Sequence, residues 1–213
     1  MFNILYDPTR MLYMVPAIVI GLAFHEFAHG YAAYRLGDKT AYYQGRLTLN
    51  PFAHLDIVGT LMIFLAGFGW ARPVPINPSA FKGNVNTGII KVSLAGPAAN
   101  FITALLASVI YGGLILHLDG DPYYLNIIDK IFMYIIIINL SLGVFNLVPV
   151  PPLDGSKILA GMMPQSRRFL YSMEQYGTII LILLLFTGIL GKVLGIILSP
   201  LMALMNFVIS ALQ

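Results

Sequence analysis

Long apolar stretches constrain this chain more than any other feature. Three of them, residues 11–34, 88–116 and 124–145, are each long enough to cross a hydrocarbon core about 30 Å thick as a helix. A fourth, residues 176–212, is nearly all apolar but contains several glycines and a proline. The chain is 58% hydrophobic and only 10% charged, whereas soluble domains carry about 25% charged residues. The composition therefore predicts an integral membrane protein.

Three shorter segments leave more than one interpretation open. Residues 57–68 are apolar but too short to cross alone, so we expect a partly immersed helix. Residues 42–49 alternate partly between apolar and polar side chains, which fits a short β-hairpin or a plain interfacial turn. Residues 176–212 favour two short spans paired as a hairpin, with one span and an interfacial helix as the alternative.

The expected fold is an α-helical polytopic membrane protein with a bundle of about five or six transmembrane or partly immersed helices. We expect residues 1–213 to form a single domain embedded in the lipid bilayer. The absence of cysteine excludes disulfides and thiolate metal ligands, so histidine and carboxylate side chains remain as candidate ligands.

Lysine and arginine are distributed unevenly between the two sides of the predicted bundle. Nine of the twelve fall on one side, and the positive-inside rule places that side in the cytoplasm. The carboxyl terminus would lie there too if residues 176–212 form a hairpin. The net charge of +3 is small, and we expect no nucleic-acid partner. The nine are Arg35, Lys39, Arg46, Arg72, Lys82, Lys91, Lys157, Arg167 and Arg168, and the other three are Arg10, Lys130 and Lys192.

The motif H-E-x-x-H, residues 25–29, reaches into the last third of the first apolar stretch. His25 and His29 are four residues apart, so both imidazoles project from one helix face with Cβ atoms roughly 5–6 Å apart. That spacing allows both to bind one zinc ion, with Glu26 as a general base. A chance match is the alternative, but ionisable groups are costly inside a membrane segment and usually serve a function.

Catalytic zinc takes three protein ligands, and the motif supplies two. Most carboxylates fall on the wrong side of the membrane or in solvated segments, which leaves Asp56 and Asp154. Asp154 follows the third span at the end of a proline-rich segment that we expect to be extended. It is the favoured third ligand, although it could instead be the N-cap of a helix starting at Ser156.

Two pairs of motifs resemble a known family. H-E-F-A-H-G at residues 25–30, followed by N-L-V-P-V-P-P-L-D-G at residues 146–155, resembles the site-2 protease family of intramembrane zinc metalloproteases. L-A-G-P-A-A-N at residues 94–100 and G-R-L-T-L-N-P-x-x-H-L-D at residues 45–56 resemble its compact prokaryotic branch, which lacks PDZ and CBS domains. With this resemblance, the catalytic core covers about residues 11–155.

The resemblance implies a zinc metalloendopeptidase that hydrolyses peptide bonds within transmembrane helices. His25, His29 and Asp154 would hold one Zn2+ per chain, and Glu26 would be the catalytic general base. The substrates would be single-span membrane proteins. The protein would be a multi-pass protein of the cell membrane, with its active site towards the cytoplasmic face.

Three further residues have open assignments. Asn146 would lie beside the substrate, or would be a C-cap of the third span. His54 could line the site or bind a second metal, although a hydrogen bond within the turn at Asn50 and Pro51 is slightly favoured. Asn100 is expected to make a hydrogen bond between helices, with orientation of a metal ligand as the lesser alternative.

The rival function is a membrane metal transporter, or a metal-binding membrane protein without hydrolase activity. Transporters also place histidines and carboxylates inside spans. A transporter would be expected to carry polar groups along a path through several spans, whereas here they gather at one depth near one face. Glu26 also has no evident purpose in a protein that does not need a base.

Overall fold

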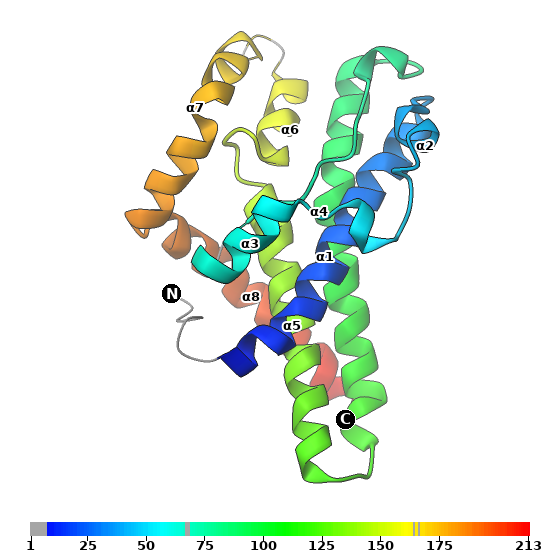
Figure 1. The fold of residues 1–213 in the computed structure, drawn as a ribbon, viewed down its shortest axis with the longest axis vertical. Coiled ribbons are helices and arrows are strands. Elements are labelled where there is room, and N and C mark those ends of the chain that lie inside the picture. Colours follow the sequence, from blue (N-terminus) through cyan, green and yellow to red (C-terminus); the bar gives the residue numbers. More distant parts are fainter. Residues whose placement is uncertain (1–7, 67–68, 164, 166) are drawn as a thin grey trace.

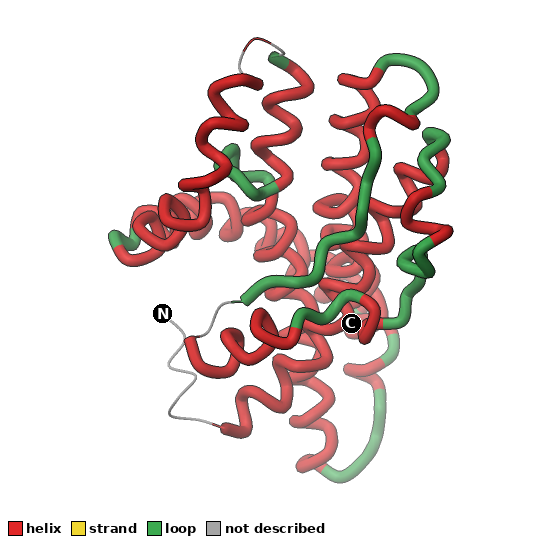
Figure 2. Tube along the Cα trace, turned by 45° about the horizontal axis from the view of Figure 1, so that its top comes forward, coloured by secondary structure: helices red, strands yellow, loops and turns green. Residues whose placement is uncertain are grey.

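The computed structural model describes residues 8–66, 69–163, 165 and 167–213. Within these residues the regular structure is helical, and Figure 2 shows helices joined by loops without a strand. Four helices are long and apolar enough to cross a membrane: Met11–Arg35, Val85–His117, Pro122–Asn146 and Ile189–Leu212. The predicted class, a helical polytopic membrane protein, is therefore confirmed.

The centre of the bundle is formed by α1 (Pro8–Arg35), α4 (Val85–Gly113) and α5 (Pro122–Asn146), with α8 (Ile189–Leu212) against α4 and α5 (Figure 1). The three predicted spans correspond to α1, α4 and α5. Lipid tails are as apolar as a protein core, so close packing of small residues stabilises such contacts more than hydrophobic burial does. The core accordingly contains several alanines and β-branched side chains, among them Ala17, Ala104, Ala107, Ile136 and Ile209.

Polar side chains at the ends of two of these helices satisfy the first free N–H groups. Asn84 precedes α4, and its Oδ1 accepts hydrogen bonds from the N–H groups of Asn86 and Thr87 at 2.9 and 3.1 Å. Asp121 precedes α5 and accepts from the N–H of Tyr123 at 2.8 Å. Such caps favour helix initiation at these positions.

The short helix expected over residues 57–68 is α3 (Ile57–Ala66), and residues 67 and 68 lie outside the described part of the chain. The prediction of a β-hairpin at residues 42–49 is wrong. The chain instead forms α2 (Thr40–Tyr43) and then turns at Gly45, where φ is +64°. Asp38 favours the helical turn because its side chain accepts a hydrogen bond from the N–H of Thr40. The interfacial turn was the better alternative.

The C-terminal region also differs from the favoured prediction. It contains α7 (Arg167–Phe186), whose apolar part is short, and α8, with a turn between them at Gly188. The two helices do not return the chain to its starting side. Leu212 O lies 3.3 Å from Nε2 of His117, in the connection between α4 and α5, whereas α7 starts near α6 (Asp154–Met162) (Figure 1). Of the two, only α8 is both long and apolar enough for a span, because the apolar part of α7 is limited to Ser172–Phe186. This favours the alternative with one span, and an interfacial position of the other helix stays a prediction.

The carboxyl terminus and the two histidines therefore lie at different ends of the bundle. Gly96 of α4 faces the histidines, and Gly112 of the same helix faces the backbone of Ile209 near the end of α8. Sixteen residues of α-helix between these glycines correspond to about 24 Å. The condition for a carboxyl terminus on the side of the metal motif, a hairpin over residues 176–212, is therefore not met, because α7 and α8 together carry the chain from one end of the bundle to the other.

Candidate metal centre

Helix α1 presents His25 and His29 towards α4, and both side chains are buried. The two helices come very close at this level. A Cβ atom on Gly96 of α4 would lie 2.4 Å from Nε2 of His29 and 2.6 Å from Cε1 of His25. Only glycine leaves room for both imidazoles here. The motif at residues 94–100 contains Gly96, but the sequence alone does not connect this glycine with the two histidines.

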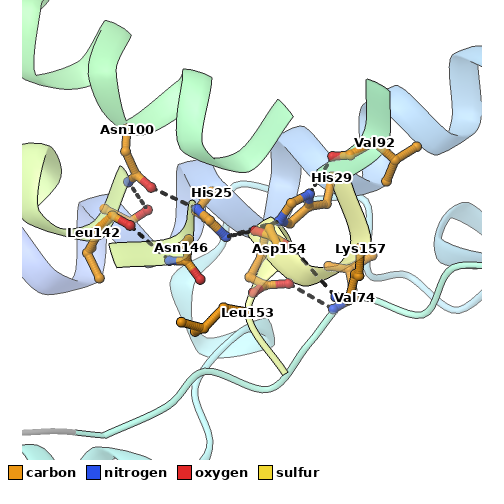
Figure 3. A network of polar contacts seen from close by, with 12 residues as sticks. His25, His29, Val74, Val92, Asn100, Leu142, Asn146, Leu153, Asp154 and Lys157 are labelled. Atoms are coloured by element: carbon orange, nitrogen blue, oxygen red, sulfur yellow. Dashed lines mark hydrogen bonds and ion pairs between the residues drawn. The ribbon is translucent and has the colours of Figure 1, made fainter. Parts of the chain in front are cut away.

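Both imidazoles are oriented through their Nδ1 atoms. The Nδ1–H of His25 donates to Oδ1 of Asn100 at 2.7 Å, and the Nδ1–H of His29 donates to the carbonyl of Val92 at 2.7 Å (Figure 3). With the proton on Nδ1, each ring directs the lone pair of Nε2 towards the other. The two Nε2 atoms are 3.0 Å apart.

Asp154 completes this arrangement from α6. Its Oδ2 lies 3.2 Å from Nε2 of His25 and 3.0 Å from Nε2 of His29, and the residue is 5% exposed. The alternative of a helix cap does not hold, because α6 begins at Asp154 itself and its N-cap position is Leu153. The other carboxylate oxygen, Oδ1, is 3.5 Å from Nζ of Lys157.

Two unprotonated ring nitrogens and one carboxylate oxygen thus converge in a buried space. Such a group repels itself unless a cation or a shared proton lies between its members. Ligand atoms around a tetrahedral zinc ion with bonds of about 2.0–2.1 Å are separated by about 3.3 Å, which is near the observed 3.0–3.2 Å. Among the described residues, His25, His29 and Asp154 form the group that could hold a metal ion. The donor set and its spacing fit zinc.

Glu26 is buried beside the two histidines in sequence but is held by a different part of the chain. Its Oε2 accepts a hydrogen bond from the N–H of Val74 at 2.8 Å. Val74 belongs to the proline-rich loop after α3, and its side chain is also buried, against Gly30. Nothing in the motifs indicated that Val74 contacts Glu26.

The segment between α5 and α6 is not helical, as the prolines predict, but it is not extended either. Hydrogen bonds from the N–H of Val150 to Val148 O and from the N–H of Leu153 to Val150 O fold residues 147–153 into turns. Proline excludes a helix but fits turns as readily as extended chain. The backbone then returns on itself, so that a Cβ on Gly155 would lie 2.2 Å from Leu147 O. This return brings Asp154 back to the end of α5.

Asn146 is the last residue of α5, and the C-cap position is Leu147. Its Nδ2 donates to Leu142 O of the same helix at 3.0 Å (Figure 3). Asn146 therefore lies at the helix end nearest the cluster. The structure holds no substrate, and contact with one stays a prediction.

Asn100 serves both of the roles considered for it. Besides accepting from His25, its Nδ2 donates to Gly21 O and to Oδ1 of Asn139, each at 3.0 Å. Asn139 in turn donates to Ile135 O. This fully buried chain of amides, which includes Asn139, links α1, α4 and α5 to the imidazole of His25.

His54 stays outside the cluster. The residue is fully buried, and its Nε2 donates to Thr48 O at 2.7 Å. Its own backbone carbonyl accepts from the N–H of Arg72 at 2.8 Å. His54 therefore braces the turn after α2, close to the slightly favoured alternative, and is not grouped with other candidate metal ligands in the described part of the chain.

The structure combines several helices of membrane-spanning length with a buried cluster of two imidazoles and one carboxylate that could hold a metal ion. These features are those of a polytopic membrane metalloprotein. Comparison with known proteins identifies the family. The family model described as "Peptidase family M50" matches residues 112–188, a region that includes Asp154. No solved structure matches the chain significantly.

Curated relatives extend the similarity to almost the whole chain. The Bacillus subtilis protein "Putative zinc metalloprotease YwhC" is 40% identical over 199 residues, which cover 91% of this chain and 90% of the relative. The Mycolicibacterium smegmatis protein "Putative zinc metalloprotease Rip2" is 30% identical over 82% of this chain and 66% of its own length. The Methanocaldococcus jannaschii protein "Zinc metalloprotease MJ0392" is 22% identical over 86% of this chain and 45% of its own length.

The chain therefore belongs to peptidase family M50, the site-2 protease family. It is a zinc metalloprotease with several membrane-spanning helices. This confirms the family, the enzyme class and the zinc cofactor expected from the motifs. A metal transporter or a non-hydrolytic metal-binding protein is disfavoured accordingly.

Proposed function

We propose that this zinc metalloprotease hydrolyses peptide bonds of single-span membrane proteins within the bilayer, close to the cytoplasmic face. The observation that carries the proposal is the position of the metal cluster. Its two histidines belong to a helix with the length and hydropathy of a membrane span. They lie in the second half of that helix, so a substrate would be cut inside the membrane but nearer one surface.

In this proposal His25, His29 and Asp154 hold one zinc ion per chain. When bound, zinc polarises the scissile carbonyl and increases the acidity of a coordinated water. Glu26 is the catalytic general base: its carboxylate accepts a proton from the attacking water and donates it to the leaving amine. Burial of Glu26 excludes competing bulk water, and the Val74 N–H holds one of its oxygens.

Two asparagines support this chemistry in different ways. Asn100 orients His25, because its Oδ1 accepts the Nδ1 proton and so keeps Nε2 free to bind the metal. Asn146 binds the unwound backbone of the substrate, since it is the last residue of α5, beside the connection to Asp154. His54 has a supporting role only, in bracing the turn after α2.

A transmembrane helix hides its peptide bonds in its own hydrogen bonds, so a substrate must unwind before attack. We expect cleavage near residues that weaken a helix. A proline or glycine pair placed at the scissile region of a substrate should speed cleavage, and the same pair placed two turns away should not. Equal rates for both substrates would contradict cleavage of an unwound helix.

The cytoplasmic orientation is supported by the nine basic residues on the side of the metal motif. The chain has no cysteine, so single cysteines report topology without background. In intact cells, a membrane-impermeant maleimide should label Asp119→Cys in the connection between α4 and α5 but not Lys82→Cys. The reverse pattern would place the site on the outer face.

The test of the function is cleavage of a panel of single-span substrates by the purified protein in detergent, beside Glu26→Gln, with zinc quantified in both. We expect equal zinc contents and cleavage by the parent only. Zinc in both proteins and cleavage by neither would contradict the proposed substrate class. Cleavage by Glu26→Gln at the parent rate would contradict its role as the base.

A further inference from the structure

The loop at residues 71–77, which we call the strap, connects the end of α3 to the region before α4. It is drawn in Figure 2 as a long loop passing over the helices. Its sequence, A-R-P-V-P-I-N, places prolines on both sides of Val74. Proline has no N–H, so Val74 holds the one backbone donor among these three residues. That donor is bonded to Glu26.

The first end of the strap is fastened by the segment between α2 and α3. A terminal guanidinium nitrogen of Arg46 donates to Arg72 O at 2.8 Å and to Pro73 O at 3.2 Å. The N–H of Arg72 donates to His54 O at 2.8 Å, and an isolated β-bridge joins Leu55 and Ala71. The backbone of three consecutive residues, Ala71, Arg72 and Pro73, is thereby held immediately before Val74.

The other end is fastened by a carboxylate. Oδ2 of Asp38 accepts from the N–H of Asn77 at 2.6 Å. Asp38 is 1% exposed, and its other oxygen accepts from Thr40. The strap is thus fixed on both sides of Val74 by groups that lie outside the metal cluster.

We propose that the strap is a positioning element for the catalytic base, and that Arg46 is the positioning residue that acts through it. Arg46 fixes the carbonyls just before Val74, Val74 presents its single N–H to Oε2, and the second oxygen of Glu26 stays available for the reaction. The motif at residues 45–56 then has a defined purpose, since it supplies both Arg46 and the carbonyl of His54. This inference rests on the role of Glu26 given above.

The chemistry of arginine suits this task better than that of lysine. A planar guanidinium bonds two neighbouring carbonyls from a fixed direction, whereas an ammonium on a flexible stem cannot fix both. Misplacing a catalytic group by about 1 Å can cost about a hundredfold in rate. Loose binding of the strap should therefore lower turnover without changing substrate or metal affinity.

The first test needs no substrate. Amide hydrogen exchange over residues 71–77 is measured by mass spectrometry on the zinc-loaded protein in detergent. Arg46→Ala should accelerate exchange of the strap by about tenfold or more, because local opening becomes easier. Arg46→Lys should give an intermediate rate. Arg72→Ala is the matched control, since it removes an exposed arginine of the strap but keeps the backbone bonds, and its exchange should equal that of the parent.

The second test uses a single-span substrate that the parent cleaves. Arg46→Ala should lower kcat by about tenfold to a hundredfold, with KM and zinc content unchanged. Val74→Pro, which replaces the N–H by a ring carbon and also changes the side chain, should lower kcat similarly, and Val74→Ala, which changes the side chain but keeps the N–H, should lower it less. If both changes act through one hydrogen bond to Glu26, the double variant should be little worse than either alone.

Four results would overturn the proposal. They are parent-like exchange in both Arg46→Ala and Arg46→Lys, a rise in KM with kcat unchanged, loss of zinc from folded Arg46→Ala, and fully additive effects in the double variant. A parent that cleaves no substrate would instead count against the proposed function. In that case the hydrogen-exchange measurement still tests the proposal, since Glu26→Ala should accelerate exchange of the strap as Arg46→Ala does.

Discussion

Gly96 and His29 come from different helices, and a methyl group on the first would lie only 2.4 Å from Nε2 of the second. The contact sets how closely α1 and α4 approach at the level of the metal cluster. It also explains why two imidazoles and a carboxylate fit into one buried space.

Gly96→Ala should therefore disrupt the metal site. Overpacking costs about 1–3 kcal/mol, so zinc affinity should fall by roughly tenfold or more. Zinc stoichiometry measured across a series of competing chelator concentrations checks this. Gly113→Ala is the control on the same helix, because a Cβ there meets no atom within 4 Å. Equal affinities for the two variants would mean that the helices separate without cost.

Asn100→Ala should weaken zinc binding without abolishing folding. The substitution removes the acceptor for the Nδ1 proton of His25, and loss of such a supporting hydrogen bond typically costs about 10–100-fold in metal affinity. Thr103→Val, which removes a hydroxyl bonded only to Ala99 O of the same helix, should leave affinity unchanged. Parent-like zinc affinity in Asn100→Ala would show that packing alone orients His25.

The choice of third ligand can be tested with a pair of matched variants. Asp154→Asn removes a charge from the cluster and should abolish both stoichiometric zinc and peptidase activity, because a neutral amide is a poor zinc ligand. Asp56→Asn should keep both. The side chain of Asp56 accepts from the N–H of Gly59 at 2.7 Å, and asparagine caps a helix about as well. Loss of zinc in Asp56→Asn but not in Asp154→Asn would show that Asp56 is the third ligand.

Asp38 should make stability depend on pH. Burial alone would raise the pKa of this carboxyl, but hydrogen bonds from Thr40 and Asn77 outweigh it and lower the pKa below its ordinary value near 3.8. A lowered folded-state pKa stabilises the protein above the unfolded pKa, and the contribution is lost as pH falls through the folded value.

Asp38→Asn should accordingly cost roughly 1.5–3 kcal/mol at neutral pH, seen as a lower thermal midpoint in detergent. The difference between parent and variant should shrink as pH falls below about 4. If the difference in stability between parent and variant stayed constant down to pH 2, the loss would come from poorer packing of the amide and not from the missing charge.

The local pattern of the chain predicts three of the four membrane-length helices and the candidate metal ligands that the structure brings together. Hydropathy predicts helix positions because the bilayer requires every backbone group in a span to be bonded within it. Spacing predicts His25 and His29 because neighbours one helical turn apart share a face. The side of the membrane leaves Asp56 and Asp154 as candidates, and the proline-rich segment before Asp154 favours the latter. These are consequences of local rules, and the structure agrees with them.

Only the tertiary structure decided which groups from distant segments meet. The contact of Val74 with Glu26, the clearance at Gly96 and the amide chain from His25 to Asn139 depend on how α1, α4, α5 and the strap pack. The same holds for residues 42–49, 147–153 and 176–212, where the pattern allows several conformations of similar free energy. There the competing local preferences are weak, so contacts with residues distant in sequence decide between turn and strand. They also decide between a helical hairpin and two helices that lead from one end of the bundle to the other.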